Sequence, residues 1–436
     1  MKIFLAQQNY HIGNFESNTR KIIDAISHAK QQGGDIIVFS ELCVCGYPPR
    51  DFLYFKDFID KCYQAIDEIR MHADGIAVLI GAPHRNTETS GKDLFNAAYF
   101  LADKEIRQVI HKTCLPTYDV FDEDRYFEPA ANWSIVTFQD KRIAVTICED
   151  IWNLGDNPLY LYCPMDKLME QQPEVMINLS ASPFDYTHDE DRKAAVKANV
   201  LKYKIPMFYC NGVGSQTEIV FDGTSLVFDK HANLCGQLAS FKEDLQSFTL
   251  HDDGTIAGEV IEPADKISAS ECNPANLDEG LNIEHIYEAL LMGIRDYFSK
   301  MGFKKAILGS SGGIDSAVTL SLACKALGSE NVHAILMPSQ YSTSHSVSDA
   351  EQLSRNLQNK YDVIPIKNIY EAFLTELNPY FKDLPFNVTE ENIQSRTRGN
   401  LLMALANKFN YILLNTSNKS ELATGYGTLY GDMAGG

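Results

Sequence analysis

The chain has 436 residues, 45% hydrophobic and 22% charged, an ordinary balance for globular proteins and enough length for two packed domains. A formal net charge of −20 argues against a nucleic-acid-binding surface. Ten cysteines in a chain this long do not indicate a disulfide framework, and no apolar stretch is long enough to span a membrane. The first apolar stretch turns polar at Gln7 and Gln8, too soon for a secretory signal. We therefore expect a cytoplasmic protein with reduced thiols that binds neither nucleic acid nor membrane.

The first 261 residues alternate short apolar stretches with amphipathic segments, a pattern typical of layered α/β structure. The predicted strands are 3–7, 36–40, 76–80, 143–147, 175–179 and 207–211, and the predicted helices are 15–31 and 191–203. Between Asn96 and Lys112, two further β segments flank the turn Asp103-Lys104. The domain should therefore combine parallel and antiparallel strands.

Residues 262–282 have no periodicity and contain proline, serine, asparagine and acidic residues, which indicates a linker. We therefore place one domain at 1–261 and a second at 283–436. The second begins with a predicted helix over 283–301 and a strand that ends at Leu308. The later predicted elements are strands 334–337, 362–365 and 411–414 and helices 346–358 and 391–409. This alternation predicts a doubly wound parallel sheet, which binds its ligands at the carboxyl ends of the strands.

A glycine-rich motif follows the first strand of the second domain. Its residues are Gly309, Ser310, Ser311, Gly312, Gly313, Ile314, Asp315 and Ser316. Such a turn before a helix surrounds an anion with backbone N–H groups and the positive helix end, and its glycines let a polyphosphate approach closely. The serine hydroxyls can donate to phosphate, and Asp315 can hold Mg²⁺. No Gly-Lys-Ser/Thr follows, so this is not a Walker motif. It resembles the PP-loop of enzymes that split ATP between its α and β phosphates and adenylate a substrate.

Three reactive side chains stand at predicted strand ends in the first domain: Glu41, Lys112 and Cys148. A carboxylate, an ammonium and a thiol that converge at one sheet edge form an activated nucleophile site. Glu41 would take the thiol proton, and Lys112 would stabilise the thiolate and an oxyanion. Taken singly, each has an ordinary interpretation as a surface acid, a solvated lysine or a buried cysteine.

Together these residues resemble the nitrilase superfamily, through segments 39–42, 46–48, 111–116 and 147–150. The resemblance covers nearly all of the first domain and implies an α-β-β-α sandwich that hydrolyses amides through a thioester. Segments 115–123 and 178–182 resemble the glutaminase domain of glutamine-dependent NAD synthetases. That resemblance implies that Tyr118 and Ser182 line a glutamine pocket. Family members often carry a basic residue shortly after this serine, and His188 stands at that position here.

Two polar blocks in the second domain follow the PP-loop, at 391–399 and 415–426. The first opens a helix with polar and basic groups, which suits a dinucleotide or an ordinary exposed first turn equally well. In the second, Thr416 and Lys419 suit phosphates, and Glu421 could share Mg²⁺ with Asp315. Gly425, Gly427 and Gly431 would keep the next loop mobile, as a lid over substrate requires.

These blocks resemble the NAD synthetase domain. The resemblance implies that Thr416 and the PP-loop bind ATP. It also implies a deamido-NAD site formed by Asn392, Glu421, Tyr426, Gly427, Thr428 and Leu429. Domains of this family continue for about a hundred residues more. We therefore expect the second domain to be incomplete here and to lack part of its subunit contacts.

The resemblance implies an ATP-dependent ligase that amidates deamido-NAD to NAD with ammonia from glutamine, through an adenylated nicotinate. Its substrates would be glutamine, ATP and deamido-NAD, with Mg²⁺, in a homo-oligomer. Two alternatives remain at this point. One is another glutamine-fed PP-loop ligase, and the other is an ATP-binding protein with an inactive nitrilase-like domain.

Overall fold

The computed structural model describes residues 1–258 and 283–435, apart from 89, 155–158, 186–187 and 383. The chain divides into two compact units, Met1–Ala289 and Leu290–Gly436. The predicted linker, 262–282, lies outside the described residues, so the predicted domain boundaries stay predictions. Among the described residues, no helix has both the length and the apolar character needed to cross a membrane.

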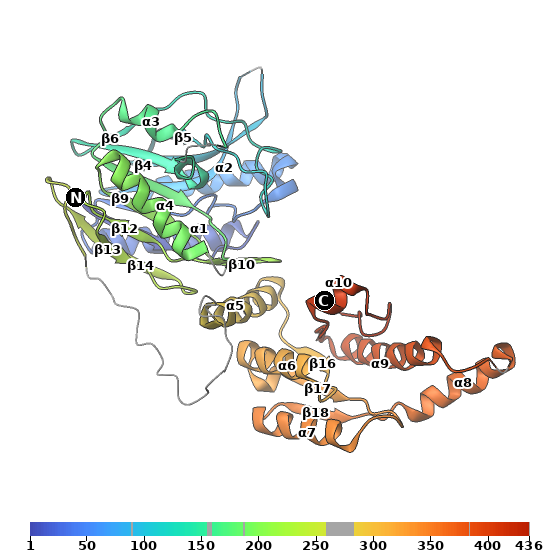
Figure 1. Ribbon diagram of the computed structural model, residues 1–436. Coiled ribbons are helices and arrows are strands. Elements are labelled where there is room, and N and C mark those ends of the chain that lie inside the picture. The colour runs from blue at the N-terminus through green and yellow to red at the C-terminus, as the bar shows by residue number, and fades with distance from the viewer. Residues whose placement is uncertain (89, 155–158, 186–187, 259–282, 383, 436) are drawn as a thin grey trace. The chain divides into compact units, whose positions relative to one another are not determined.

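Two mixed sheets form the first unit (Figure 1). The larger sheet has the order β15 (Ile256–Ala257), β14 (Asp244–Leu250), β1 (Lys2–Gln7), β2 (Ile36–Phe39), β3 (Ala77–Arg85), β4 (Leu94–Ala102) and β5 (Glu105–His111). The smaller has the order β13 (Leu234–Gln237), β12 (Leu226–Phe228), β9 (Met207–Asn211), β8 (Val175–Ser180), β7 (Lys141–Ile147) and β6 (Val136–Phe138). A separate hairpin pairs β10 (Val213–Gln216) with β11 (Ile219–Asp222).

The strands are apolar on both faces because both faces of each sheet are covered. Ile3 and Leu5 of β1 pack in one core with Val145 of β7 and Ile177 of β8, so the two sheets lie face to face. Phe4, between Ile3 and Leu5, points to the opposite side, as the period of two in a strand requires.

Helices cover the outer faces of both sheets. Against the larger sheet lie α1 (Phe15–Gln31) and α2 (Lys56–Arg70), and against the smaller sheet lie α3 (Pro164–Met169) and α4 (His188–Tyr203). Helix α1 buries Ile22 and Ile26, four residues apart on one face, and begins where the Asn14 side chain accepts the Ser17 N–H at 3.3 Å. The predicted α-β-β-α sandwich is therefore confirmed.

The second unit is a parallel sheet in the order β18 (Lys360–Val363), β17 (Val332–Leu336), β16 (Ala306–Gly309) and β19 (Ile412–Leu413). Its helices are α6 (Ile314–Leu327), α7 (Ser344–Leu357), α8 (Lys367–Phe381), α9 (Val388–Phe409), α10 (Lys419–Thr424) and the part of α5 (Ile283–Met301) that begins at Leu290. Separate cores on the two sides of β16 show that helices cover both faces. The predicted doubly wound sheet is confirmed.

Candidate active sites

A buried ion cluster lies where three segments of the first unit meet. Lys112 follows β5, and its Nζ donates to Glu41 Oε1 at 2.7 Å and to both carboxylate oxygens of Glu123 at 2.9 and 2.8 Å. Asn96 of β4 donates through Nδ2 to Glu41 at 2.7 Å and to Glu123 at 3.2 Å. The second Glu41 oxygen accepts the Ala181 N–H at 3.1 Å, and the side chains of Lys112 and Glu41 are fully buried.

The charges of this cluster perturb one another strongly. Burial raises the pKa of Glu41 to about 7, although Lys112 acts in the opposite direction. Burial alone would lower the pKa of Lys112, but Glu123 and Glu41 hold it well above its usual value. Glu41 can therefore exchange a proton near neutral pH, whereas Lys112 stays charged.

Cys148 stands at the end of β7, at the first residue of the short 3₁₀ turn Cys148–Ile151. Its φ of +41° is left-handed, a conformation that side chains rarely adopt and that the surrounding structure must hold. Burial and the charge of Glu41 raise the pKa of the Cys148 thiol well above its usual value, while Lys112 acts to lower it. The resting thiol is therefore protonated and shares its environment with both a base and a cation.

A further carboxylate, that of Glu149, belongs to the residue after Cys148. Glu149 is buried and accepts the Tyr118 hydroxyl at 2.9 and 3.0 Å and the Tyr160 hydroxyl at 3.2 Å. Burial raises the pKa of Glu149. Tyr118 is 45% exposed, so this hydrogen bond links the buried Glu149 carboxylate to a residue that reaches the surface.

Two other residues of the predicted glutamine pocket are placed less completely. Ser182 is buried just after β8, and its backbone N–H donates to Asn211 Oδ1 at 2.8 Å. His188 begins α4, but its side chain lies outside what the structure describes. Nearby, Arg192 is fully buried and forms a two-pronged ion pair with Asp222 at 2.8 and 2.9 Å.

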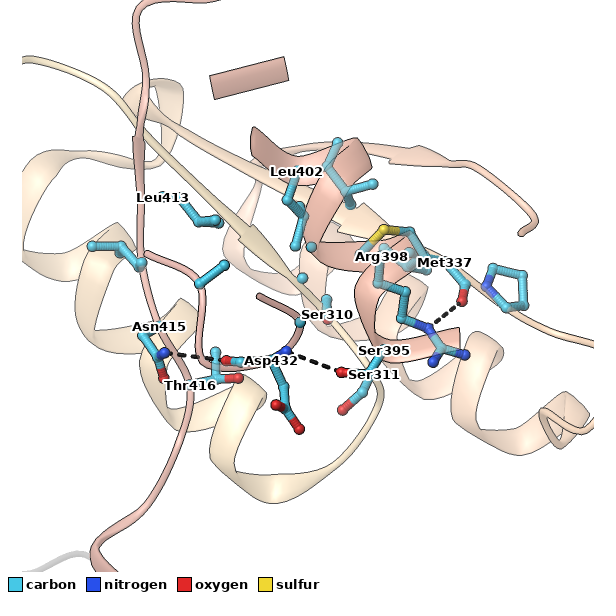
Figure 2. A pocket seen from close by; sticks show the side chains of 18 of the residues that line it. Ser310, Ser311, Met337, Ser395, Arg398, Leu402, Leu413, Asn415, Thr416 and Asp432 are labelled. Carbon is cyan, nitrogen blue, oxygen red and sulfur yellow. Dashed lines mark hydrogen bonds between the residues drawn. The ribbon is translucent and has the colours of Figure 1, made fainter. Parts of the chain in front are cut away.

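A cavity of about 420 Å³ opens at the carboxyl ends of the strands in the second unit. Figure 2 shows the serines of the PP-loop on one side and Asn415 and Thr416 on another. Arg398 of α9 also lines the cavity, and its Nε donates to the Met337 carbonyl at 3.1 Å. Burial lowers the pKa of Arg398.

The PP-loop runs from the end of β16 into α6. Ser311 and Ser316 hydroxyls lie 3.1 Å apart, and the Gly313 N–H donates to Ser311 Oγ at 3.1 Å. Gly312 has a φ of +83°, and a Cβ there would collide with the carbonyl oxygen of Ser346. The glycine is therefore required both by its conformation and by the close approach of α7.

Asp315 and Glu421, the two predicted metal ligands, both contact Asn418. The Asn418 side chain donates to Asp315 Oδ1 at 3.4 Å, and the Asn418 N–H donates to Glu421 Oε2 at 3.0 Å. Within the described part of the chain, no group of three or more His, Cys, Asp or Glu side chains could hold a metal ion. Asn418 is therefore a shared neighbour of Asp315, in the PP-loop, and of Glu421, in α10.

The predicted deamido-NAD residues fall in two groups. Thr428 donates to Asn392 at 2.8 Å, so the loop after α10 is tied to the start of α9. Tyr426 and Leu429 are exposed at 78% and 64%. Gly427 packs closely, because a Cβ there would lie 2.8 Å from the sulfur of Met433.

The final residues form a wall of the cavity (Figure 2). The Asp432 N–H donates to Ser395 at 3.0 Å, and its carbonyl accepts from Asn415 at 3.1 Å. Gly431 leaves no room for a side chain beside Ser395, so its observed role is close packing, and the mobility expected of a lid stays a prediction.

Sequence reasoning missed four polar residues of the first site: Asn96, Glu123, Glu149 and Tyr160. Asn96 offered a signal, because it is a single polar residue inside the apolar stretch of β4. Glu123 offered none, since it lies among Asp119, Asp122 and Asp124 and only the path of the loop selects it.

Comparison with known proteins covers both units. The carbon-nitrogen hydrolase family model matches residues 2–255, and the NAD synthase family model matches residues 286–436. The glutamine-dependent NAD(+) synthetase of Synechocystis sp. is 41% identical over 446 residues, which covers 100% of this chain and 77% of the relative. That of Thermotoga maritima is 37% identical over 456 residues, with the same coverage.

Among solved structures, glutamine-dependent NAD+ synthetase from Acinetobacter baumannii in complex with adenosine diphosphate matches with a TM-score of 0.90 and 36% identity. The match covers 100% of this chain and 78% of the other. Because the similarity in sequence and in fold runs through both units, the chain belongs to the family of glutamine-dependent NAD(+) synthetases.

Proposed function

We propose that the first unit releases ammonia from glutamine and that the second unit uses it, with ATP, to amidate deamido-NAD to NAD. The observation that carries the proposal is the buried cluster of Glu41, Lys112 and Glu123, whose charges all act on the Cys148 thiol. The identity of the substrates is inferred from family membership, and the mechanism of glutamine hydrolysis is inferred from the cluster.

Glutamine hydrolysis begins with transfer of the Cys148 proton to Glu41, because the resting thiol is neutral and cannot attack. The thiolate adds to the side-chain amide carbon of glutamine, and the Lys112 ammonium stabilises the resulting oxyanion. Glu41 returns the proton to the leaving nitrogen, which gives ammonia and a thioester. It then takes a proton from water as the water oxygen adds to the thioester carbon. The C–S bond breaks to release glutamate, and Glu41 returns the proton to the Cys148 sulfur. A base with a pKa of about 7 suits these transfers.

Glu149 is proposed to bind the α-ammonium group of glutamine. The carboxylates of Glu41, Glu123 and Glu149 all interact electrostatically with Lys112, so this one lysine does not balance their negative charge and a second cation would be stabilised beside them. Tyr118 holds both oxygens of Glu149 and reaches the surface. The roles of Ser182 and His188 toward the substrate carboxylate stay predictions.

In the second unit, the PP-loop is proposed to bind the phosphates of ATP, with Thr416 across the cavity. An oxygen of the nicotinate carboxylate attacks the α-phosphorus, and pyrophosphate leaves. Ammonia then displaces AMP to form the amide. A free carboxylate has no adequate leaving group, so the adenylation makes this displacement possible.

Mg²⁺ normally binds one or two carboxylates and completes its coordination with phosphate oxygens and water. Asp315 and Glu421 fit this description, since Asp315 belongs to the PP-loop, Glu421 shares the neighbour Asn418 with it, and each keeps acceptor capacity. They would hold the ion, which would neutralise phosphate charge during adenylation. The predicted homo-oligomer stays a prediction that light scattering of the purified chain tests.

The test compares the chain with its Cys148→Ala variant, each incubated with ATP, Mg²⁺ and deamido-NAD and with glutamine or ammonium. Glutamate, AMP and NAD are followed together. The variant should lose glutamate release by a factor of about 10⁴ or more and keep its ammonium-driven turnover. Glutamate release at the unmodified rate in the variant would show that the nucleophile is another residue.

A further inference from the structure

A buried aspartate, Asp150, accepts backbone hydrogen bonds from two separate segments. Its Oδ1 accepts the N–H groups of Thr113 at 3.0 Å and Cys114 at 2.9 Å. Its Oδ2 accepts the N–H of Ile147 at 3.0 Å. Asp150 is only 2% exposed, and a buried carboxylate is stable only when hydrogen bonds of this kind surround it.

The donors are chain neighbours of the reacting side chains. Thr113 follows Lys112, and Ile147 precedes Cys148. The two segments come from different sheets, because one continues β5 and the other continues β7. We infer that Asp150 is a positioning residue that fixes the Lys112 ammonium relative to the Cys148 thiol.

Lys112 is already fixed to its own sheet. Its N–H donates to the Asn96 carbonyl at 2.8 Å, and its carbonyl accepts the Ala130 N–H at 2.9 Å. Cys148 belongs to the other sheet and has a left-handed backbone that does not hold itself in place. The Asp150 carboxylate supplies a link between the two, and its ionised form is the one with acceptors for all three N–H groups.

Burial raises the pKa of Asp150 to about 6, while the N–H groups of Cys114, Ile147 and Thr113 act to lower it. The carboxylate is therefore ionised at neutral pH. The three hydrogen bonds described for its carboxylate all come from backbone N–H groups, so Asp150 would act through the geometry of its neighbours and not on the substrate.

The test is Asp150→Asn, and it rests on the proposed glutaminase function. Asparagine has one acceptor oxygen, so it can serve the Thr113 and Cys114 donors or the Ile147 donor, but not both. A displacement of about 1 Å in an active site can cost about 100-fold in rate. We expect kcat for glutamate release to fall by about that factor, with KM within about threefold and ammonium-driven turnover unchanged.

The rate of Cys148 alkylation by iodoacetamide, read by mass spectrometry of its peptide, gives an independent measurement. It should fall about tenfold or more, because a displaced Cys148 sulfur no longer lies where the Lys112 ammonium stabilises its thiolate. Asp150→Glu keeps both oxygens but moves them by one methylene. It takes the place of the asparagine variant, with the same expected losses, if that variant does not fold.

Asp229 provides the matched control. It is buried, and its Oδ1 accepts the N–H groups of His231 at 2.8 Å and Asn233 at 2.9 Å, in the turn between β12 and β13. Asp229→Asn should lower the melting temperature comparably but leave kcat and alkylation unchanged. If Asp150→Asn behaves in the same way, Asp150 is only structural and the inference fails. A wild-type chain that releases no glutamate would instead overturn the proposed function.

Discussion

Glu41→Gln should remove glutamine hydrolysis and at the same time change how stability depends on pH. The cluster of Lys112 with Glu41 and Glu123 buries one positive and two negative charges, a net charge of −1. Burial raises the pKa of Glu41 from 4.5 to about 7. Because each pKa unit corresponds to about 1.36 kcal/mol, ionising Glu41 costs the folded state about 3 kcal/mol relative to the unfolded chain.

The sign follows from the direction of the shift. The Glu41 carboxyl binds its proton more tightly in the folded chain than in the unfolded chain. Protonated Glu41 therefore stabilises the folded chain fully below about pH 4.5, and this stabilisation is lost as the pH rises through about 7. The side chain introduced by Glu41→Gln is neutral at every pH, so the variant does not undergo this loss of stabilisation. Its oxygen can still accept from Lys112 and Asn96, but its NH₂ group meets the Ala181 N–H, at a cost of about 1–3 kcal/mol.

That hydrogen-bond cost is nearly independent of pH, so the comparison between two pH values isolates the charge. Between about pH 5 and about pH 8, the unfolding free energy of Glu41→Gln should gain about 2–3 kcal/mol over that of the unmodified chain. For a domain of this size, the gain corresponds to roughly 5 °C in melting temperature, measured by scanning calorimetry.

The control is Glu243→Gln, which removes a half-exposed partner of Lys21. Surface ion pairs contribute little, so its melting temperature should follow that of the unmodified chain at both pH values. If Glu41→Gln also follows it, the cluster does not bury an uncompensated negative charge and the reasoning is wrong.

Four further changes test the two sites. Glu123→Gln should reduce kcat for glutamate release by about 100-fold, since it loosens the lysine; an unchanged kcat would make Glu123 dispensable. Tyr118→Phe removes a hydroxyl from Glu149 and should raise KM for glutamine about tenfold, whereas a fall in kcat alone would contradict a binding role. Gly312→Ala should weaken ATP binding at least about tenfold in calorimetry, because the loop cannot hold a left-handed alanine without strain; wild-type affinity would refute this. Asp315→Asn should abolish AMP formation while glutamate release persists, and AMP formation that is unchanged across a Mg²⁺ titration would point to another ligand.

Much of the fold could be predicted because buried apolar residues recur along the sequence with the repeat of a helix or a strand. Helix α1 was predicted with its observed limits, and the turn Asp103-Lys104 joins β4 to β5 with both residues at positive φ. Helix α2 was not among the predicted helices, although Phe58, Ile59 and Cys62 have helical spacing. Helix α8 has a weaker helical signal in the sequence, since it contains Pro379 and buries little of its surface.

The candidate site was predictable only where strands fix its members. Glu41, Lys112 and Cys148 follow strands, and strand ends at one edge of a layered domain must converge. Glu123 arrives on a loop, whose path depends on contacts such as the Glu123 N–H to the Pro116 carbonyl at 2.9 Å. Such contacts leave no periodic trace in the sequence.

The proposed nucleophile and its base belong to different layers of the sandwich. Glu41 and Lys112 extend from the larger sheet and Cys148 from the smaller one, and Ile177 and Leu79 lie in the apolar layer that separates the sheets. The volume of the side chains in that layer sets the separation of the two sheets. It therefore also sets the distance between the Cys148 sulfur and the side chains of Glu41 and Lys112. Loss of a single buried methyl group from this layer would therefore lower the turnover rate while the domain stays folded. Side-chain volume in this core is constrained by catalytic rate as well as by stability.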